Sequence, residues 1–308
     1  MPSWRKRRAI ARLAFWTRIG WTGCSAMSGR SKRCPTWGFC STICAGWTPD
    51  MDLKLAGQTA LIFGASKGIG LATARLLAAE GAKLALAARS IDSFGADAPG
   101  GPDTLLLAAD LTAPGDADAA VKAAVECFGR IDMLVVSAGA AQGGLFWELG
   151  DDVWETALGL KFFGLVRALR AAAPVMRDQG AGRMVAVVGN AGKQPNKRML
   201  PGAAANAACL AVIRGLAEEL APAGVRVNAV NPGPTRTGRW DTLIDRLATA
   251  SGKAAGDVEA EQMAGVPLGR ISEPDEIARI IAFLASEVSG TITGTSVTAD
   301  GGMTAAIA

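Results

Sequence analysis

The chain of 308 residues contains no histidine and no tyrosine. Without histidine, a catalytic triad built on an imidazole and a metal site with imidazole ligands are both excluded. Without tyrosine, no phenol is available as an acid or a base. The side chains that remain for chemistry are Lys, Asp, Glu, Cys, Ser, Thr and Asn.

Positive charge and cysteine are both concentrated in the first fifty residues. Residues 1–50 hold nine Lys/Arg and one acid, Asp50, which gives a net charge of +8; since the whole chain carries +4, the remainder carries −4. We therefore expect no nucleic-acid surface on the remainder. Only Cys127 and Cys209 follow residue 50, and two isolated cysteines are typical of a cytoplasmic protein.

Residues 1–50 show no sustained helical or strand period, so we expect an unstructured tail. Its longest apolar stretch, residues 9–16, is interrupted by Arg12 and is too short to span a membrane. We favour an upstream extension, with translation starting at Met51. An Arg-rich transit peptide is the second interpretation. The third is a zinc site of the tail cysteines, whose spacing fits no usual pattern: Cys24, Cys34, Cys40 and Cys44. No other metal site is expected.

From Met51 onward, short aliphatic runs alternate with longer Ala-rich stretches. This alternation predicts the α/β class: a single doubly wound Rossmann fold over residues 51–308, whose parallel sheet has helices on both faces. The seven predicted strands are 59–63, 83–88, 104–108, 131–136, 183–188, 225–230 and 293–299. The predicted helices are 68–80, 115–128, 151–178, 203–222 and 274–286.

The segment 234–263 is predicted to be irregular. It follows the carboxyl end of a strand, where open parallel sheets bind ligands, and a segment of this length is typical of a substrate lid. Four apolar residues within it recur at helical spacing and suit either a pocket wall or core packing: Trp240, Leu243, Ile244 and Leu247.

A glycine-rich turn, Gly-Ala-Ser-Lys-Gly-Ile-Gly, occupies residues 64–70 between the first predicted strand and the first predicted helix. Three glycines in seven residues are weak evidence alone. A strand, a glycine turn and a helix in succession present free backbone N–H groups and a positive helix end to a pyrophosphate. The expected cofactor contacts in the turn are Gly64, Ser66, Lys67, Gly68, Ile69 and Gly70.

Later motifs give the glycine turn its context. They are Asp110-Leu111, Ser137-Ala138-Gly139, residues 224–228 leading to Asn231-Pro232-Gly233, residues 267–270, residues 273–278 and Asp300-Gly301-Gly302. In this order they make residues 51–308 resemble the short-chain dehydrogenase/reductase family. The resemblance implies a nicotinamide-dependent enzyme that acts on a small molecule, assembles as a homodimer or homotetramer and has no membrane partner.

The resemblance also assigns cofactor contacts outside the glycine turn. It implies that Asp110 and Leu111 meet the adenine and that residues 137–139 line the ribose side. It further implies that the nicotinamide end is held by residues after the sixth predicted strand. The residues assigned in this way are Asp110, Leu111, Ser137, Ala138, Gly139, Pro232, Gly233, Thr235 and Thr237.

The end of the second predicted strand bears on the choice of cofactor. An acid at that position accepts a hydrogen bond from the ribose 2′-hydroxyl and repels a 2′-phosphate. Here the position is Ala88, followed by Arg89, and Lys67 lies in the glycine turn. Two cations without an acid favour NADP(H), with NAD(H) as the second choice. The other interpretation is that both cations are solvated surface charges.

The resemblance implies a catalytic serine, tyrosine, lysine and asparagine, and the chain has none of the four. Counting from the surrounding motifs, Gly189 stands at the serine position and Gly202 at the tyrosine position. Asn206 stands at the lysine position, and Lys161 stands at the asparagine position. Lysine and asparagine are therefore exchanged between two helices.

Lys161 has two interpretations. It supplies the charge missing at Asn206 and donates the proton itself, since the ordinary pKa of lysine, about 10.4, is close to the tyrosine value of about 10 and falls on burial; or it is a solvated helix residue. Asn190 either donates a hydrogen bond to a developing alkoxide or forms a turn. The candidate catalytic residues are Lys161, Asn190 and Asn206.

Two functions follow from these observations. The first is an NADP(H)-dependent oxidoreductase that transfers hydride between nicotinamide and a carbonyl or alcohol, with an atypical proton donor. The second is a catalytically silent NADP(H)-binding protein that acts as a sensor or as a partner subunit of an active relative. The complete series of cofactor-binding motifs favours the first function. The absence of the catalytic serine, tyrosine, lysine and asparagine favours the second.

Overall fold

The computed structural model describes residues 51–94, 98–139 and 143–306, so the tail and its cysteines lie outside the described residues. Seven strands form one sheet in the order β3-β2-β1-β4-β5-β6-β7. Every pairing between neighbouring strands is parallel, which confirms the predicted doubly wound sheet. The strands are β1 (Thr59–Phe63), β2 (Lys83–Ala88), β3 (Leu105–Ala108), β4 (Met133–Val136), β5 (Gly182–Val187), β6 (Val225–Pro232) and β7 (Ser296–Ala299).

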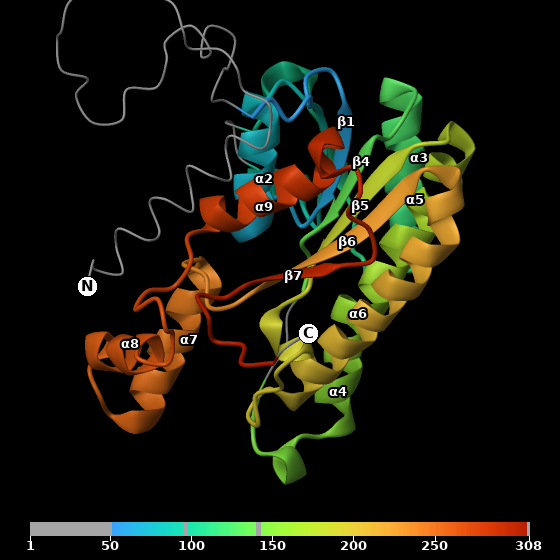
Figure 1. The fold of residues 1–308 in the computed structure, drawn as a ribbon. Coiled ribbons are helices and arrows are strands. Elements are labelled where there is room, and N and C mark those ends of the chain that lie inside the picture. The colour runs from blue at the N-terminus through green and yellow to red at the C-terminus, as the bar shows by residue number, and fades with distance from the viewer. Residues whose placement is uncertain (1–50, 95–97, 140–142, 307–308) are drawn as a thin grey trace, which may run out of the picture. The chain divides into compact units, whose positions relative to one another are not determined.

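Helices cover both faces of the sheet (Figure 1). One face carries α2 (Gly68–Ala79) and α9 (Pro274–Ala285). The opposite face carries α3 (Asp116–Phe128), α5 (Gly164–Gln179) and α6 (Leu200–Leu220). Because β1 is buried on both sides, its alternate side chains join different cores: Leu61 packs below α3, α5 and α6, and Ile62 packs below α2 and α9. This two-sided burial explains the continuous aliphatic run of the strand.

The predicted helix over 151–178 is divided in the structure. It consists of α4 (Asp151–Ala157), a π-helical segment (Leu158–Phe163) and α5. A π turn widens the helix by one residue, and the hydrophobic period of the sequence does not reveal it. Such turns occur frequently at functional sites, and this one contains Lys161.

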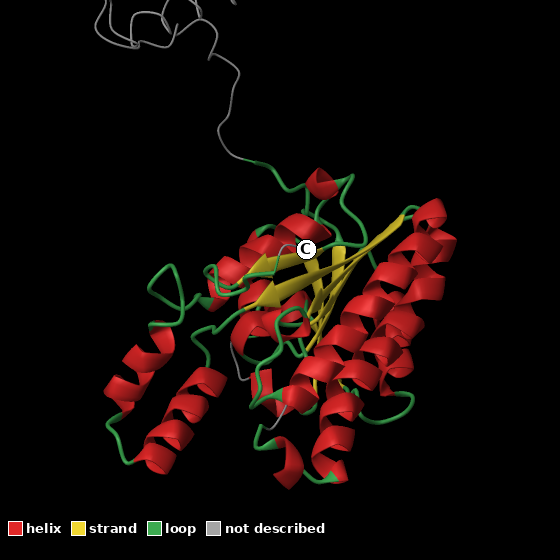
Figure 2. Ribbon diagram, turned by 60° about the horizontal axis from the view of Figure 1, so that its bottom comes forward, coloured by secondary structure: helices red, strands yellow, loops and turns green. Residues whose placement is uncertain are grey.

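The prediction that segment 234–263 is irregular is wrong. The segment contains α7 (Gly238–Ser251) and α8 (Ala255–Met263), which lie side by side beyond the sheet (Figure 2). Neither helix is long, so their stability comes from packing against each other rather than from a strong local period. Trp240, Ile244 and Val258 are buried in a small core of their own. Of the two interpretations of the apolar spacing, core packing therefore holds for Trp240 and Ile244, whereas Leu243 is 40% exposed.

Candidate cofactor and active site

The turn after β1 has the shape required to receive an anion. Gly64 and Gly68 have φ angles of +77° and +55°, in the left-handed region that favours glycine. A Cβ on Gly70 would lie 2.2 Å from the carbonyl oxygen of Gly64, so a side chain does not fit there. Lys67, which precedes α2, makes no side-chain cap, and the first N–H groups of the helix remain available. These features fit a dinucleotide pyrophosphate.

Three strand ends meet at this turn. A Cβ on Gly64 would lie 2.9 Å from the carbonyl carbon of Ser137, which follows β4. A Cβ on Gly68 would lie 3.2 Å from Cγ2 of Thr237, which precedes α7. Thr237 in turn donates from Oγ1 to the carbonyl oxygen of Thr235, after β6. The structure therefore brings together the predicted contacts at the carboxyl ends of β1, β4 and β6.

The predicted adenine end lies beside β2 and β3. Asp110 Oδ1 accepts hydrogen bonds from the backbone N and the Oγ1 of Thr112 at 2.9 and 2.8 Å. These bonds, together with the charge of Arg89, hold the pKa of Asp110 below its ordinary value. Lys67 and Arg89 are both exposed, and Ala88 is buried. Ala88 therefore stands where an acid would bind the ribose 2′-hydroxyl, and Arg89 beside it presents a cation to solvent.

Lys161 and Asn206, the exchanged pair, contact each other. Lys161 Nζ donates a hydrogen bond to Asn206 Oδ1 and a second one, of 3.3 Å, to the carbonyl oxygen of Val188. Burial, together with the nearby charge of Arg239, lowers the pKa of Lys161 to about 8. A cavity of about 10 Å³ adjoins the pair and is lined by Val136, Ala138, Lys161, Leu165, Val187, Val188, Asn206 and Cys209.

The predicted serine position is closed by Asn206. Gly189 has a φ of +127°, and a Cβ there would lie 3.0 Å from Asn206 Nδ2. A serine at 189 would be strained and would press on that amide. Gly202, at the tyrosine position, is buried in the first turn of α6. Asn206 thus lies beside the vacant serine position and one helical turn after the vacant tyrosine position.

Asn190 has a different partner from Lys161. Its Nδ2 donates to Asp300 Oδ2 at 3.2 Å, and Asp300 also accepts bonds from the backbone N and Oγ1 of Thr304 at 2.8 and 2.6 Å. Asn190 therefore ties the turn after β5 to the segment after β7, and it does not line the cavity beside Lys161. An alkoxide contact from Asn190 stays a prediction.

Arg239 belongs to the site and was missed by the sequence analysis. It lies in the first turn of α7, and its Nη2 donates to the carbonyl oxygen of Gly139. Gly139 also adjoins Lys161, because a Cβ there would lie 3.0 Å from Lys161 Cε. The signal in the sequence is faint: residues 232–240 contain two arginines and no acid.

Cys209 lies beside Lys161 but is unsuited to nucleophilic chemistry. Its Sγ donates to the carbonyl oxygen of Lys161 at 3.4 Å. Burial raises the pKa of this thiol to about 11, so it stays protonated near neutral pH. Among the residues that the structure describes, no group of three His, Cys, Asp or Glu side chains could hold a metal ion.

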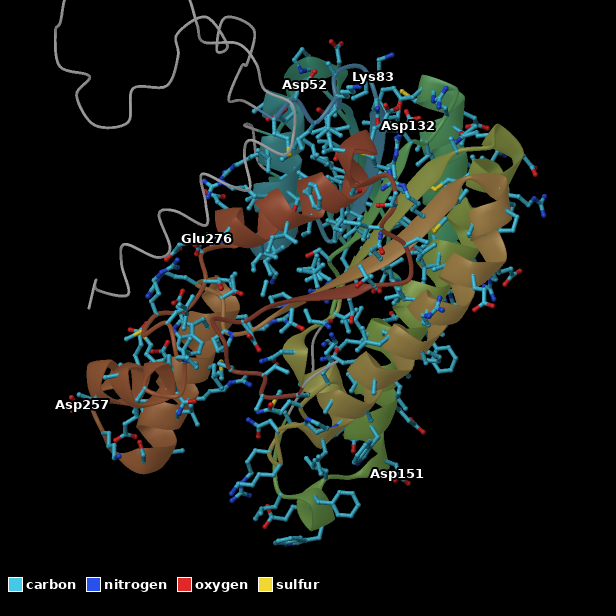
Figure 3. All side chains as sticks on the ribbon, in the orientation of Figure 1. Asp52, Lys83, Asp132, Asp151, Asp257 and Glu276 are labelled. Atoms are coloured by element: carbon cyan, nitrogen blue, oxygen red, sulfur yellow. The ribbon has the colours of Figure 1, made fainter. Side chains whose placement is uncertain are left out.

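Several charged residues lie apart from this site (Figure 3). Figure 3 shows Lys83 and Asp132 at one end of the molecule, and Asp151 and Asp257 toward the other. Asp132 is buried at the amino end of the sheet, where its carboxylate accepts bonds from the backbone N of Thr59 and from Arg130. These contacts show that Asp132 stabilises the start of β1.

Comparison with known proteins identifies the family of the chain. Residues 64–304 match the family model described as Enoyl-(Acyl carrier protein) reductase. The short-chain reductase protein NovJ of Streptomyces niveus is 38% identical over 254 residues, which cover 80% of this chain and 93% of NovJ. The 3-oxoacyl-(acyl-carrier-protein) reductase FabG of Vibrio cholerae is 34% identical over 258 residues, which cover 82% of this chain and 99% of FabG.

A solved structure extends the agreement to three dimensions. The L-sorbose reductase of Gluconobacter frateurii, complexed with NADPH and L-sorbose, superposes with a TM-score of 0.78 at 30% sequence identity. The match covers 83% of this chain and 100% of that one. The glycine turn, the parallel sheet and these relatives, which are oxidoreductases, establish that the chain belongs to the short-chain dehydrogenase/reductase family.

Proposed function

We propose that the chain is an NADP(H)-dependent oxidoreductase that interconverts a carbonyl and an alcohol, with Lys161 as the proton donor. The observation that carries this proposal is the contact of Lys161 Nζ with Asn206 Oδ1 and the carbonyl oxygen of Val188. This contact lies at a cavity that Ala138, a predicted cofactor contact, also lines. A titratable group is thereby positioned beside the predicted cofactor site in a chain that has no tyrosine.

The surroundings of Lys161 suit an acid. Its two acceptors are a carbonyl and an amide oxygen, which hold the ammonium form in place, and its pKa of about 8 keeps that form in the majority at neutral pH. A bound nicotinamide supplies hydride chemistry. In reduction, the carbonyl carbon gains the hydride and the oxygen gains the proton of Lys161, which is left as a neutral amine and regains a proton from solvent.

The choice of NADP(H) rests on charge at the end of β2. Arg89 is exposed there, Lys67 is exposed in the glycine turn after β1, and Ala88 replaces the acid that would repel a 2′-phosphate. The L-sorbose reductase, which shares the fold, is described in complex with NADPH. Both facts support the proposed preference.

Substitution of the lysine tests the proposed proton donor. Lys161→Met keeps the length of the side chain and removes its charge, so we expect reduction of ketones and aldehydes to slow by about 10²- to 10⁴-fold, the contribution of a general acid. NADPH affinity should change only slightly, because the glycine turn is intact. Lys122→Met, on the exposed face of α3, is the matched control and should behave as the parent.

Two results would count against this proposal. A Lys161→Met variant as fast as the parent excludes Lys161 as the donor. A parent that binds NADPH but oxidises it with none of a panel of ketones and aldehydes supports the catalytically silent alternative. Gly202→Tyr combined with Asn206→Lys and Lys161→Asn, which leaves a single ammonium group at the cavity, would then test whether the fold can regain activity.

A further inference from the structure

Two cations approach Gly139 from different elements. Arg239, on α7, donates to the carbonyl oxygen of Gly139. Lys161, in the π-helical segment, lies on the other side: a Cβ built on Gly139 would be 3.0 Å from Lys161 Cε. The charge of Arg239 acts on Lys161, since it contributes, after burial, to the lowered pKa of Lys161. Two like charges thus lie close together beside Gly139, a predicted contact on the ribose side of the cofactor.

Neither cation has an acidic partner among the described residues. The acceptors of Lys161 are a carbonyl and an amide, and the acceptor of Arg239 is a carbonyl. Arg236, three residues before Arg239, differs: its Nη1 lies 3.1 Å from Glu259 and its Nε lies 3.2 Å from Glu273. Arg236 is therefore neutralised by two carboxylates, whereas Arg239 is hydrogen-bonded only to a neutral carbonyl oxygen.

We propose that the substrate carries an anionic group, a carboxylate or a phosphate, close to its reactive carbonyl, and that Arg239 binds this group while Lys161 meets the carbonyl oxygen. This inference rests on the proposed function. A guanidinium binds a carboxylate or a phosphate through two parallel N–H···O bonds and an opposite charge, neither of which a single carbonyl oxygen supplies. The anion therefore displaces Gly139 as the acceptor of Arg239. It also offsets the repulsion between the two cations.

The turn between β5 and α6 supports the same substrate class. Residues 189–206 contain Lys193, Lys197 and Arg198 and no acid. The carbonyl oxygen of Arg198 accepts a hydrogen bond of 2.9 Å from the backbone N of Gly144, so this turn lies against the chain that follows β4. Asp300 binds Asn190 of this turn and Lys193 donates to the carbonyl oxygen of Ser296, so the exposed Lys197 and Arg198 are the cations that attract anions toward the site.

Paired substrates test the inference. Pyruvate is compared with methyl pyruvate, and dihydroxyacetone phosphate with dihydroxyacetone, in NADPH-dependent reduction by the full chain. Arg239→Gln should raise KM for the anionic member of the preferred pair by about 10- to 100-fold, the loss of one charge-assisted bond, and leave KM for the neutral member unchanged. Arg246→Gln, exposed on the same helix, is the matched control and should match the parent.

Calorimetric titration with oxalate and with inorganic phosphate separates the inference from the proposed function. Binding to the parent that is lost in Arg239→Gln supports the anion site even if no compound is reduced. Reduction of neutral and anionic substrates with equal KM in both proteins overturns the anion site and leaves the proposed function standing. A matching loss of NADPH affinity in Arg239→Gln assigns Arg239 to the cofactor phosphates and overturns the inference. Failure of both reduction and anion binding overturns both.

Discussion

Lys161 loses a charge when it gives up its proton, and this change is favoured by its surroundings. Burial opposes the ammonium form most strongly, and the neighbouring guanidinium of Arg239 repels it as well. Both effects make Lys161 a stronger acid than a lysine in water. Asn206 and Val188 act in the opposite direction by accepting bonds from the ammonium. The balance between these effects places the pKa of Lys161 at about 8, close to neutral pH.

The pKa of Lys161 predicts opposite pH dependences for the two reaction directions. Reduction needs the ammonium form, so its kcat/KM should fall as pH rises through about 8. Alcohol oxidation needs the neutral amine and should rise over the same range. Initial rates of both reactions across this range measure the two profiles. A profile of reduction that is flat through pH 8, or an inflection that persists in Lys161→Met, would contradict the assignment.

Arg89 predicts the order of cofactor affinities. In Arg89→Asp a cation is replaced by an anion at the end of β2, so the affinity for NADPH should fall by about tenfold or more and the affinity for NADH should exceed it. Calorimetric titration with each cofactor gives the two constants. Arg75→Asp, exposed on α2, is the control for a charge change elsewhere. Equal affinities of the parent for both cofactors would refute the prediction.

At the scale of elements, the strands were predictable and the helices beside the site were less so. A strand such as β1, buried at every residue, appears in the sequence as an unbroken aliphatic run. The π-helical segment is not visible in this way, because a single extra residue within a long helical pattern is too small an irregularity to stand out in the sequence. Motif counting placed Lys161 and Asn206 separately, but their contact depends on how the π turn orients the lysine. A single arginine such as Arg239 has no periodicity, so only the fold reveals its place.

The glycine turn has no room for a side chain at Gly70, so we expect a substitution there to lower the stability of the fold. Gly70→Ala puts a methyl group 2.2 Å from the carbonyl oxygen of Gly64, so we expect a loss of about 1–3 kcal/mol in the free energy of unfolding and weaker NADPH binding. Gly215→Ala is the matched control, because no atom lies within 4 Å of its Cβ position in α6. This variant should gain about 0.5–1 kcal/mol.

Denaturant unfolding of the two glycine variants measures these changes directly. An unfolding midpoint of Gly70→Ala equal to that of the parent would show that the turn can move away from the methyl group. In that case the glycine serves the approach of the cofactor alone, and only the affinity for NADPH would fall.

At the scale of the molecule, residues from Asp52 onward form one compact unit. The strongly basic composition of residues 1–50 and their lack of apolar periodicity predict that the fold does not depend on them. A chain that begins at Met51 should therefore have the melting temperature and the NADPH affinity of the full chain. A fall of several degrees on truncation, or stoichiometric zinc in the full chain, would refute this. Assembly into a homodimer or homotetramer likewise stays a prediction. Sedimentation of the full chain and of the chain that begins at Met51 tests it.

The contact between Lys161 and Asn206 also limits how this sequence can change. Asn206→Lys alone would set two ammonium groups beside one cavity of about 10 Å³, and Lys161→Asn alone would leave two amides and no cation there. Each single step gives a worse pair than the double exchange, so the effects of the two substitutions are not additive. The residues, 45 positions apart, are therefore retained or replaced together, and a relative that has one of them is expected to have both.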